Sequence, residues 1–192
     1  MSQHKEQQGF VTFAQNTADV DYLHLAYVQA LNIKATQQIN SYAVVVDGIT
    51  NELITEEHRR VFDYIIIAES LGPFDAEAQA FWLTPFKETI KLESDLLFTR
   101  SIDHWWTAFR LKDVCLSHGA KNIYSIQSGV RRYRELFDAN NLPDVYNGLM
   151  YFRYSQEAHI FFESARYIQD NWGNVKRGLK NCIEDQPSTD VL

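Results

Sequence analysis

The chain has 192 residues, of which 45% are hydrophobic and 14% aromatic, so one domain with a sizeable buried core is expected. Its formal net charge of −7 repels polyanions, so nucleic acid would have to be bound by a local basic patch. The first eight residues are polar and lack the apolar run of a secretory signal, and no apolar stretch reaches the roughly 18 residues of a membrane span. A single soluble, cytoplasmic domain over residues 1–192 is therefore predicted, with flexible ends at residues 1–8 and 186–192.

The first third of the chain alternates between strand-like and helix-like segments. Runs rich in β-branched and aromatic residues predict strands at residues 9–16, 42–47 and 63–68. Between them, apolar residues at intervals of three or four predict a helix after the first strand, begun by a cap at Thr17 or Asp19, and a short helix at residues 55–62. Nearly continuous apolar strands separated by helices are typical of a parallel sheet covered on both faces.

The rest of the chain continues the α/β pattern less regularly. The run ETIKL predicts another strand, and a helix is expected after the following LLFTRSIDHWW. Residues 146–155 predict a further strand, and residues 155–172 an amphipathic helix whose apolar side holds Ala158, Phe161, Phe162, Ala165 and Ile168. The predicted fold class is α/β, Rossmann-like, with a mostly parallel central sheet flanked by helices.

Acidic residues directly after the ETIKL strand are the strongest candidates for chemistry. The usual glycine-rich phosphate loops and the HExxH and GxSxG motifs are all absent from the sequence. Glu93 and Asp95, two positions apart at a strand end, could converge on one divalent cation that bridges to diphosphate oxygens. On spacing alone, such a triplet at a strand end is more often a solvated turn.

Three stretches of the sequence together resemble the GT-A glycosyltransferases, especially glycogenin-like and phage-type enzymes. ETIKLESDLLFTRSIDHWW looks like the segment in which a strand leads into the DxD motif and is followed by an apolar strand and a turn that ends in a tryptophan. FWLTPFK resembles the approach to this motif. YNGLMYFRYSQEA resembles the later strand on the acceptor side of these enzymes. The resemblance, which covers residues 9–172, implies a nucleotide-diphospho-sugar transferase fold, with Glu93 and Asp95 as ligands of Mn²⁺ or Mg²⁺.

The sequence also departs from the family pattern in three ways. Glu93 stands where the first Asp of the motif is commoner. The histidine that many of these enzymes supply as a further metal ligand near the C-terminus has no clear counterpart. The chain ends at PSTDVL, where family members usually continue, so a truncated or minimal form is expected.

By the same resemblance, the end of the first strand contacts the donor nucleotide through Ala14, Gln15 and Asn16. Asp47, at the end of the second strand, would hold the base or the ribose. Asn16 and Asp47 are explained just as well as turn and cap residues, because short polar side chains commonly bond to nearby backbone amides.

Three more residues take roles by resemblance in the second half of the chain. Lys87 would lie near the sugar or diphosphate, although a surface lysine is an equally good interpretation. Asn147 and Gly148 would contact the acceptor or the donor sugar, with Asn147 and Asp95 assigned to catalysis. Asn-Gly is also a common turn pair, which is the alternative for these two residues.

The predicted function is metal-dependent transfer of a sugar from a nucleotide diphosphate sugar to an acceptor hydroxyl on a carbohydrate, a protein or a modified DNA base. The DNA alternative rests on Arg131, Arg132 and Arg134, which form a local basic cluster that is otherwise a solvated helix face. Two other classes stay open: a nucleotidyltransferase, and a non-catalytic nucleotide-sugar-binding remnant or interaction module.

Overall fold

The computed structural model describes residues 6–68, 77–119, 138–143 and 145–179. Its strands are β1 (Glu6–Phe13), β2 (Tyr42–Val46), β3 (Tyr64–Ile67), β4 (Phe86–Leu92), β5 (Val114–His118) and β6 (Val145–Arg153). Its α-helices are α1 (Tyr22–Thr36), α2 (Gly48–Asn51), α3 (Glu56–Val61), α4 (Ala80–Leu83), α5 (Asp103–Phe109), α7 (Gln156–Asp170) and α8 (Trp172–Val175), with 3-10 turns η1 (Glu77–Gln79) and η2 (Lys176–Gly178).

Within the described residues, the strands form one sheet in the order β3-β2-β1-β4-β6-β5. The four strands from β3 to β4 run parallel, and β6 lies antiparallel between β4 and β5. The predicted α/β class with a mostly parallel sheet is therefore confirmed. None of the helices in the described part of the chain is long and apolar enough to cross a membrane.

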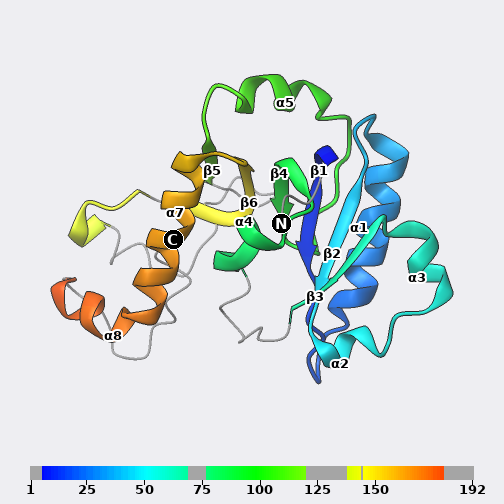
Figure 1. Cartoon of the computed structure of the whole chain (residues 1–192), viewed down its shortest axis with the longest axis horizontal. Helices are drawn as coiled ribbons and strands as arrows, with labels where there is room; N and C mark the ends of the chain where they lie inside the picture. Colours follow the sequence, from blue (N-terminus) through cyan, green and yellow to red (C-terminus); the bar gives the residue numbers. More distant parts are fainter. Residues whose placement is uncertain (1–5, 69–76, 120–137, 144, 180–192) are drawn as a thin grey trace.

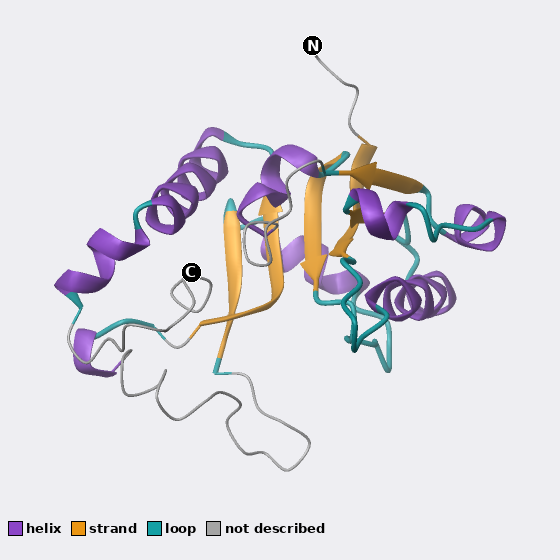
Figure 2. Cartoon of the chain, turned by 90° about the horizontal axis from the view of Figure 1, so that it is seen from below, coloured by secondary structure: helices purple, strands orange, loops and turns teal. Residues whose placement is uncertain are grey.

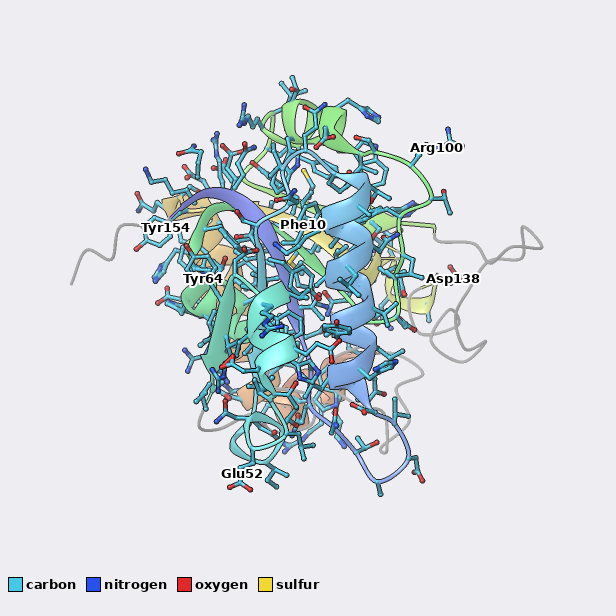
Figure 3. All side chains as sticks on the ribbon, turned by 90° about the vertical axis from the view of Figure 1, so that its right-hand side faces the viewer. Phe10, Glu52, Tyr64, Arg100, Asp138 and Tyr154 are labelled. Atoms are coloured by element: carbon cyan, nitrogen blue, oxygen red, sulfur yellow. The ribbon has the colours of Figure 1, made fainter. Side chains whose placement is uncertain are left out.

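Helices cover both faces of this sheet (Figures 1 and 2). On one face, α1, α3 and α5 pack over a core that includes Phe10, Tyr42 and the fully buried Trp106. In Figure 3 the side of the molecule with α1 and α3 faces the viewer, and α1 lies in front of the strand that carries Phe10. On the other face, α4 and α7 pack through Phe81 and Phe162 against β6. Because both faces are covered, the central strands are apolar on both sides, as the sequence indicated.

Several boundaries differ from the sequence-based expectations. β1 begins at Glu6, so residues 6–8 belong to the sheet rather than to a flexible end. The cap of α1 is Asp21, whose side chain accepts a hydrogen bond from the His24 amide, and not Thr17 or Asp19. The expected flexible segment at residues 186–192 lies outside the described residues.

The region after β4 holds the largest local differences. The apolar residues 96–98 form no strand, and the residues expected as a turn before the tryptophans begin helix α5 instead. Strand β5 was not predicted, because its five residues VCLSH mix polar and apolar types without alternation and are only partly buried. Its pairing with β6 supplies the edge of the sheet.

Candidate functional site

The Glu93-Ser94-Asp95 turn lies at the carboxyl end of β4, the central strand of the sheet. Its position is set from α1 by Gln29, a fully buried side chain whose amide donates to the carbonyls of Glu93, at 2.6 Å, and Leu96, at 2.7 Å. The other end of the Gln29 amide accepts from Thr12 and Tyr42. The first helix therefore holds the acidic turn in place through a fully bonded side chain.

Tyr146 fixes the orientation of the Glu93 side chain. Its hydroxyl donates to Glu93 Oε2 at 2.5 Å, and the Glu93 amide donates to the carbonyl of Gly148 at 2.9 Å. A Cβ at position 148 would overlap the Tyr146 ring, so the glycine makes room for that ring. Asn147 and Gly148 lie inside β6, so the interpretation of this pair as a turn is wrong.

Three carboxylates, those of Glu93, Asp95 and Glu77, act on the Tyr146 hydroxyl. Burial raises the pKa of Tyr146 most, and the hydrogen bond to Glu93 and the charges of Glu93, Asp95 and Glu77 raise it further. Glu93 is partly buried and Asp95 is exposed. The carboxyl edge of the sheet is therefore strongly acidic at this point, although no three His, Cys, Asp or Glu residues in the described ranges are grouped to hold a metal.

A buried ion pair lies beside this acidic turn. The Lys91 side chain is only 1% exposed, and its ammonium group donates to Glu77 Oε1 and, at 2.9 Å, to the carbonyl of Asn147. The side-chain amide of Asn147 donates to the other oxygen of Glu77. Asn147 Oδ1 is buried and has no hydrogen-bond partner among the described residues.

The predicted nucleotide contacts at the first two strands lie at the same edge of the sheet, but their side chains serve as caps. Asn16 donates to Asp21 at 2.9 Å and accepts from the Leu23 amide at 2.8 Å, at the start of α1. Asp47 accepts from the Thr50 amide at 2.7 Å and begins α2. Ala14 is fully buried, and Gln15 is partly buried beside it. The cap alternative is thus observed for Asn16 and Asp47, and a nucleotide contact by them stays a prediction.

Lys87 lies far from the acidic turn and from the predicted nucleotide contacts. It is exposed and lies near the amino end of β4, six positions before Glu93, and its carbonyl accepts from the Tyr154 amide. In Figure 3, Tyr154 stands toward the opposite end of the molecule from Glu52, which follows the carboxyl end of β2. Six residues of strand span about 20 Å, which separates Lys87 from the acidic turn.

The structure adds four residues that the sequence did not single out: Gln29, Glu77, Lys91 and Tyr146. A glutamine among the apolar positions of a helix and a lysine between two apolar residues of a strand are visible in the sequence as breaks in the pattern. Glu77 and Tyr146 carry no comparable signal, because isolated acids and tyrosines are ordinary in loops and strands. The arginines at positions 131, 132 and 134 lie outside the described residues.

Comparisons with known proteins agree on the fold. No protein-family model matches the sequence, and no curated protein matches it either. Among solved structures, the galactosyltransferase LgtC, in complex with donor and acceptor sugar analogues, is similar with a TM-score of 0.61 and 14% identity, over 95% of this chain and 68% of that one.

Two further glycosyltransferases are similar in the same way. GlyE from Streptococcus pneumoniae has a TM-score of 0.58 and 11% identity, over 97% of this chain and 42% of that one. Mouse xyloside xylosyltransferase 1 has a TM-score of 0.52 and 12% identity, over 77% of this chain and 67% of that one. The chain therefore has the Rossmann-like GT-A fold that the sequence predicted.

Proposed function

We propose that this protein is a metal-dependent glycosyltransferase that moves a sugar from a nucleotide diphosphate sugar to an acceptor hydroxyl. The fold is that of glycosyltransferases, and the observation that carries the proposal is the acidic turn at the carboxyl end of β4. Glu93 of this turn is oriented by Tyr146, and the turn itself is held by Gln29. Ligands of open α/β sheets bind at this edge, so the turn stands where a donor would be expected.

Glu93 and Asp95 suit a hard divalent cation of the kind the resemblance implies. Mg²⁺ is commonly bound by one or two carboxylates, with water and substrate phosphates completing its oxygen ligands. Two carboxylates at one turn match that mode without a third protein ligand. A bound Mn²⁺ or Mg²⁺ would supply positive charge that stabilises the diphosphate leaving group.

The remaining residues contribute binding and orientation. The hydrogen bond from the Tyr146 hydroxyl holds Glu93 Oε2, so the Glu93 carboxylate has a defined orientation toward the expected donor site. Gln29 removes freedom from the turn by bonding to two of its carbonyls. Positioning of donor and acceptor together with leaving-group stabilisation accounts for most of the rate in such a transfer.

The sequence leaves the acceptor as a carbohydrate, a protein or a modified DNA base. The DNA alternative depends on arginines outside the described residues, so it keeps the standing of a sequence prediction. Salt-sensitive binding of DNA that contains hydroxymethylated bases would support it.

Thermal unfolding with a panel of nucleotide diphosphate sugars, with and without Mn²⁺, tests the proposal. A donor at about 100 times its Kd stabilises a protein by about 2.7 kcal/mol. That free energy corresponds to roughly 5–10 °C for a domain of this size. We expect a metal-dependent shift for one donor, which Asp95→Ala abolishes and Asp170→Ala, at an exposed site at the end of α7, leaves intact.

Product analysis then separates the proposal from its rival. Release of a nucleoside diphosphate from the stabilising donor, with the sugar passed to an acceptor or water, is the expected result. Release of pyrophosphate from a nucleoside triphosphate would identify a nucleotidyltransferase and contradict the proposal. A shift without any turnover would favour a non-catalytic nucleotide-sugar-binding remnant, and no shift with any donor or metal would favour an interaction module.

A further inference from the structure

A lysine occupies an apolar layer of the sheet next to the acidic turn. Across the sheet from Lys91, its β6 partner Met150 packs with Phe81 and Phe162 in the apolar cluster under α7. The Lys91 side chain is 1% exposed, so its charge is removed from water. A buried ammonium group is tolerated only with close partners, which here are Glu77 and the carbonyl of Asn147.

This ion pair is a poor device for stability. Removing the Lys91 charge from water has a large desolvation cost, which its attraction to the partly exposed Glu77 need not repay, and well-packed apolar residues usually do as well or better. The β6 partner Met150 fills the same layer with an apolar side chain, so packing in this layer does not call for a lysine. The pair is better explained by what it does to Glu77, whose side chain is 26% exposed and so still reaches solvent.

Glu77 is held from two sides in a single orientation. Lys91 donates to one of its carboxylate oxygens and the Asn147 amide donates to the other. The same Asn147 side chain leaves its Oδ1 buried and unpartnered among the described residues. A buried acceptor without a donor is unfavourable, so a ligand that donates to it recovers that free energy.

We propose that Glu77, positioned by Lys91, recognises a hydroxyl group of the donor sugar, next to the sugar contact that the resemblance already implies for Asn147. This inference rests on the proposed function and extends it to the sugar itself. Glu77 and Asn147 Oδ1 offer only acceptors, whereas hydroxyl groups donate, and each carboxylate oxygen has a further lone pair beyond the bond it already accepts.

The hydrogen-bonding groups and charges at this position disfavour the other ligand types. Phosphate oxygens are acceptors, and neither the Glu77 carboxylate nor Asn147 Oδ1 has a hydrogen to donate to them. A cation is disfavoured because the Lys91 ammonium already neutralises Glu77. Glu77 and the acidic turn both act on the Tyr146 hydroxyl, so the sugar-binding acceptors adjoin the carboxylates assigned to the metal and diphosphate.

Calorimetric titration of the protein with each ligand in the presence of Mn²⁺ tests the inference. The quantity compared is the affinity for the nucleotide diphosphate sugar divided by the affinity for the bare nucleoside diphosphate. The probes are UDP against UDP-glucose, UDP-galactose and UDP-xylose, and GDP against GDP-mannose. The variant is Glu77→Gln combined with Lys91→Met, which removes both charges and keeps the volume, so that no uncompensated buried lysine is left.

We expect the double variant to lower this ratio about tenfold, which is about 1.4 kcal/mol, and to change the affinity for the bare diphosphate less than twofold. Lys91→Met alone should lower the ratio too, because Glu77 loses the donor that orients it, whereas a merely structural role would weaken both ligands equally. Glu88→Gln is the matched control, since Glu88 pairs with Arg110 near the other end of β4. A donor that lacks the recognised ring hydroxyl should bind the wild type more weakly than the complete donor does. The double variant should bind these two donors with equal affinity.

An unchanged ratio in the double variant, with the diphosphate still bound, would overturn this inference and leave the proposed function standing. A wild type that binds neither the diphosphates nor their sugar conjugates would overturn the proposed function, and the inference with it. Equal loss of both ligands in the double variant would assign the ion pair to structure and also reject the inference.

Discussion

The two halves of the carboxyl edge of the sheet use similar polar residues in different ways. At the ends of β1 and β2, Asn16 and Asp47 bond to backbone amides at the starts of the next helices. At the end of β4, Glu93 bonds instead to a tyrosine side chain, and Glu77 to a lysine and an asparagine. The first group completes the fold, because helix ends need side-chain acceptors.

The second group caps no helix end. Its burial of polar groups costs free energy that contacts within the described protein do not offset. It includes a buried charge pair and an orphaned Asn147 oxygen. Native proteins concentrate such local inconsistencies at functional sites. We therefore expect substitutions at the β1 and β2 ends to change stability, and substitutions on the β4 and β6 side to change ligand binding.

The largest expected effect is that of Gln29→Leu, which removes the link between the two regions. Four hydrogen bonds are lost, and the hydroxyls of Thr12 and Tyr42 and the carbonyls of Glu93 and Leu96 lose a partner inside the protein. We expect the free energy of unfolding to fall by about 3 kcal/mol or more, since each buried group left unsatisfied costs about 1–3 kcal/mol. Urea unfolding measures it.

The control for this change is Leu31→Ala, at an exposed position of the same helix, which should lie within about 0.5 kcal/mol of the wild type. A Gln29→Leu protein as stable as this control would show that the acidic turn does not depend on α1.

Tyr146→Phe should act on binding more than on stability. It removes the hydroxyl that orients Glu93 and keeps the ring that packs over Gly148. Metal-dependent donor affinity should fall about tenfold, which corresponds to about 1.4 kcal/mol, when measured by calorimetry with Mn²⁺. Tyr167→Phe, at an exposed position of α7, serves as the control. Unchanged donor affinity would move the metal site away from Glu93.

Asn16→Ala tests the structural half of the comparison. The variant loses the bonds to Asp21 and to the Leu23 amide, and loss of a helix cap typically costs about 1 kcal/mol. We expect that loss in urea unfolding and less than a twofold change in nucleotide affinity. A large loss of affinity at unchanged stability would restore the nucleotide contact expected from the sequence and contradict the comparison.

The smallest expected effect is a pH dependence at Asp103, which ties the start of α5 to the segment after α1. Burial raises its pKa, but hydrogen bonds from Ser101 and from the amides of Ile39 and Gln38 outweigh burial, and the pKa is lowered. A lowered folded-state pKa adds stability that is present above the ordinary aspartate value and is lost as the pH falls through the folded value.

Asp103→Asn should therefore cost about 1 kcal/mol at pH 7 and progressively less below about pH 4, where the wild-type carboxyl is protonated. Urea unfolding at pH 7 and pH 3 measures the difference. The same loss at both values would mean that the carboxylate charge contributes nothing.

Much of the fold follows from local patterns in the sequence. The apolar runs of β2 and β3 and the spacing in α7 identify their elements, because burial on both faces or on one helix side needs those residue types. The acidic turn was also identified, from its place after the β4 strand. Strand β5 was not predicted, because an edge strand is only partly covered and its sequence shows no clear alternation of apolar and polar residues.

What only the tertiary structure decided is which polar residues meet. Glu77 and Asn147 are 70 positions apart, and Tyr146 and Glu93 are 53 apart, so no local pattern records either pair. The antiparallel insertion of β6 beside β4 creates both contacts. The sequence by itself determined the class of fold and the acidic turn, because these depend on the period and composition of neighbouring residues; the partners of that turn depend on strand order, which neighbouring residues do not encode.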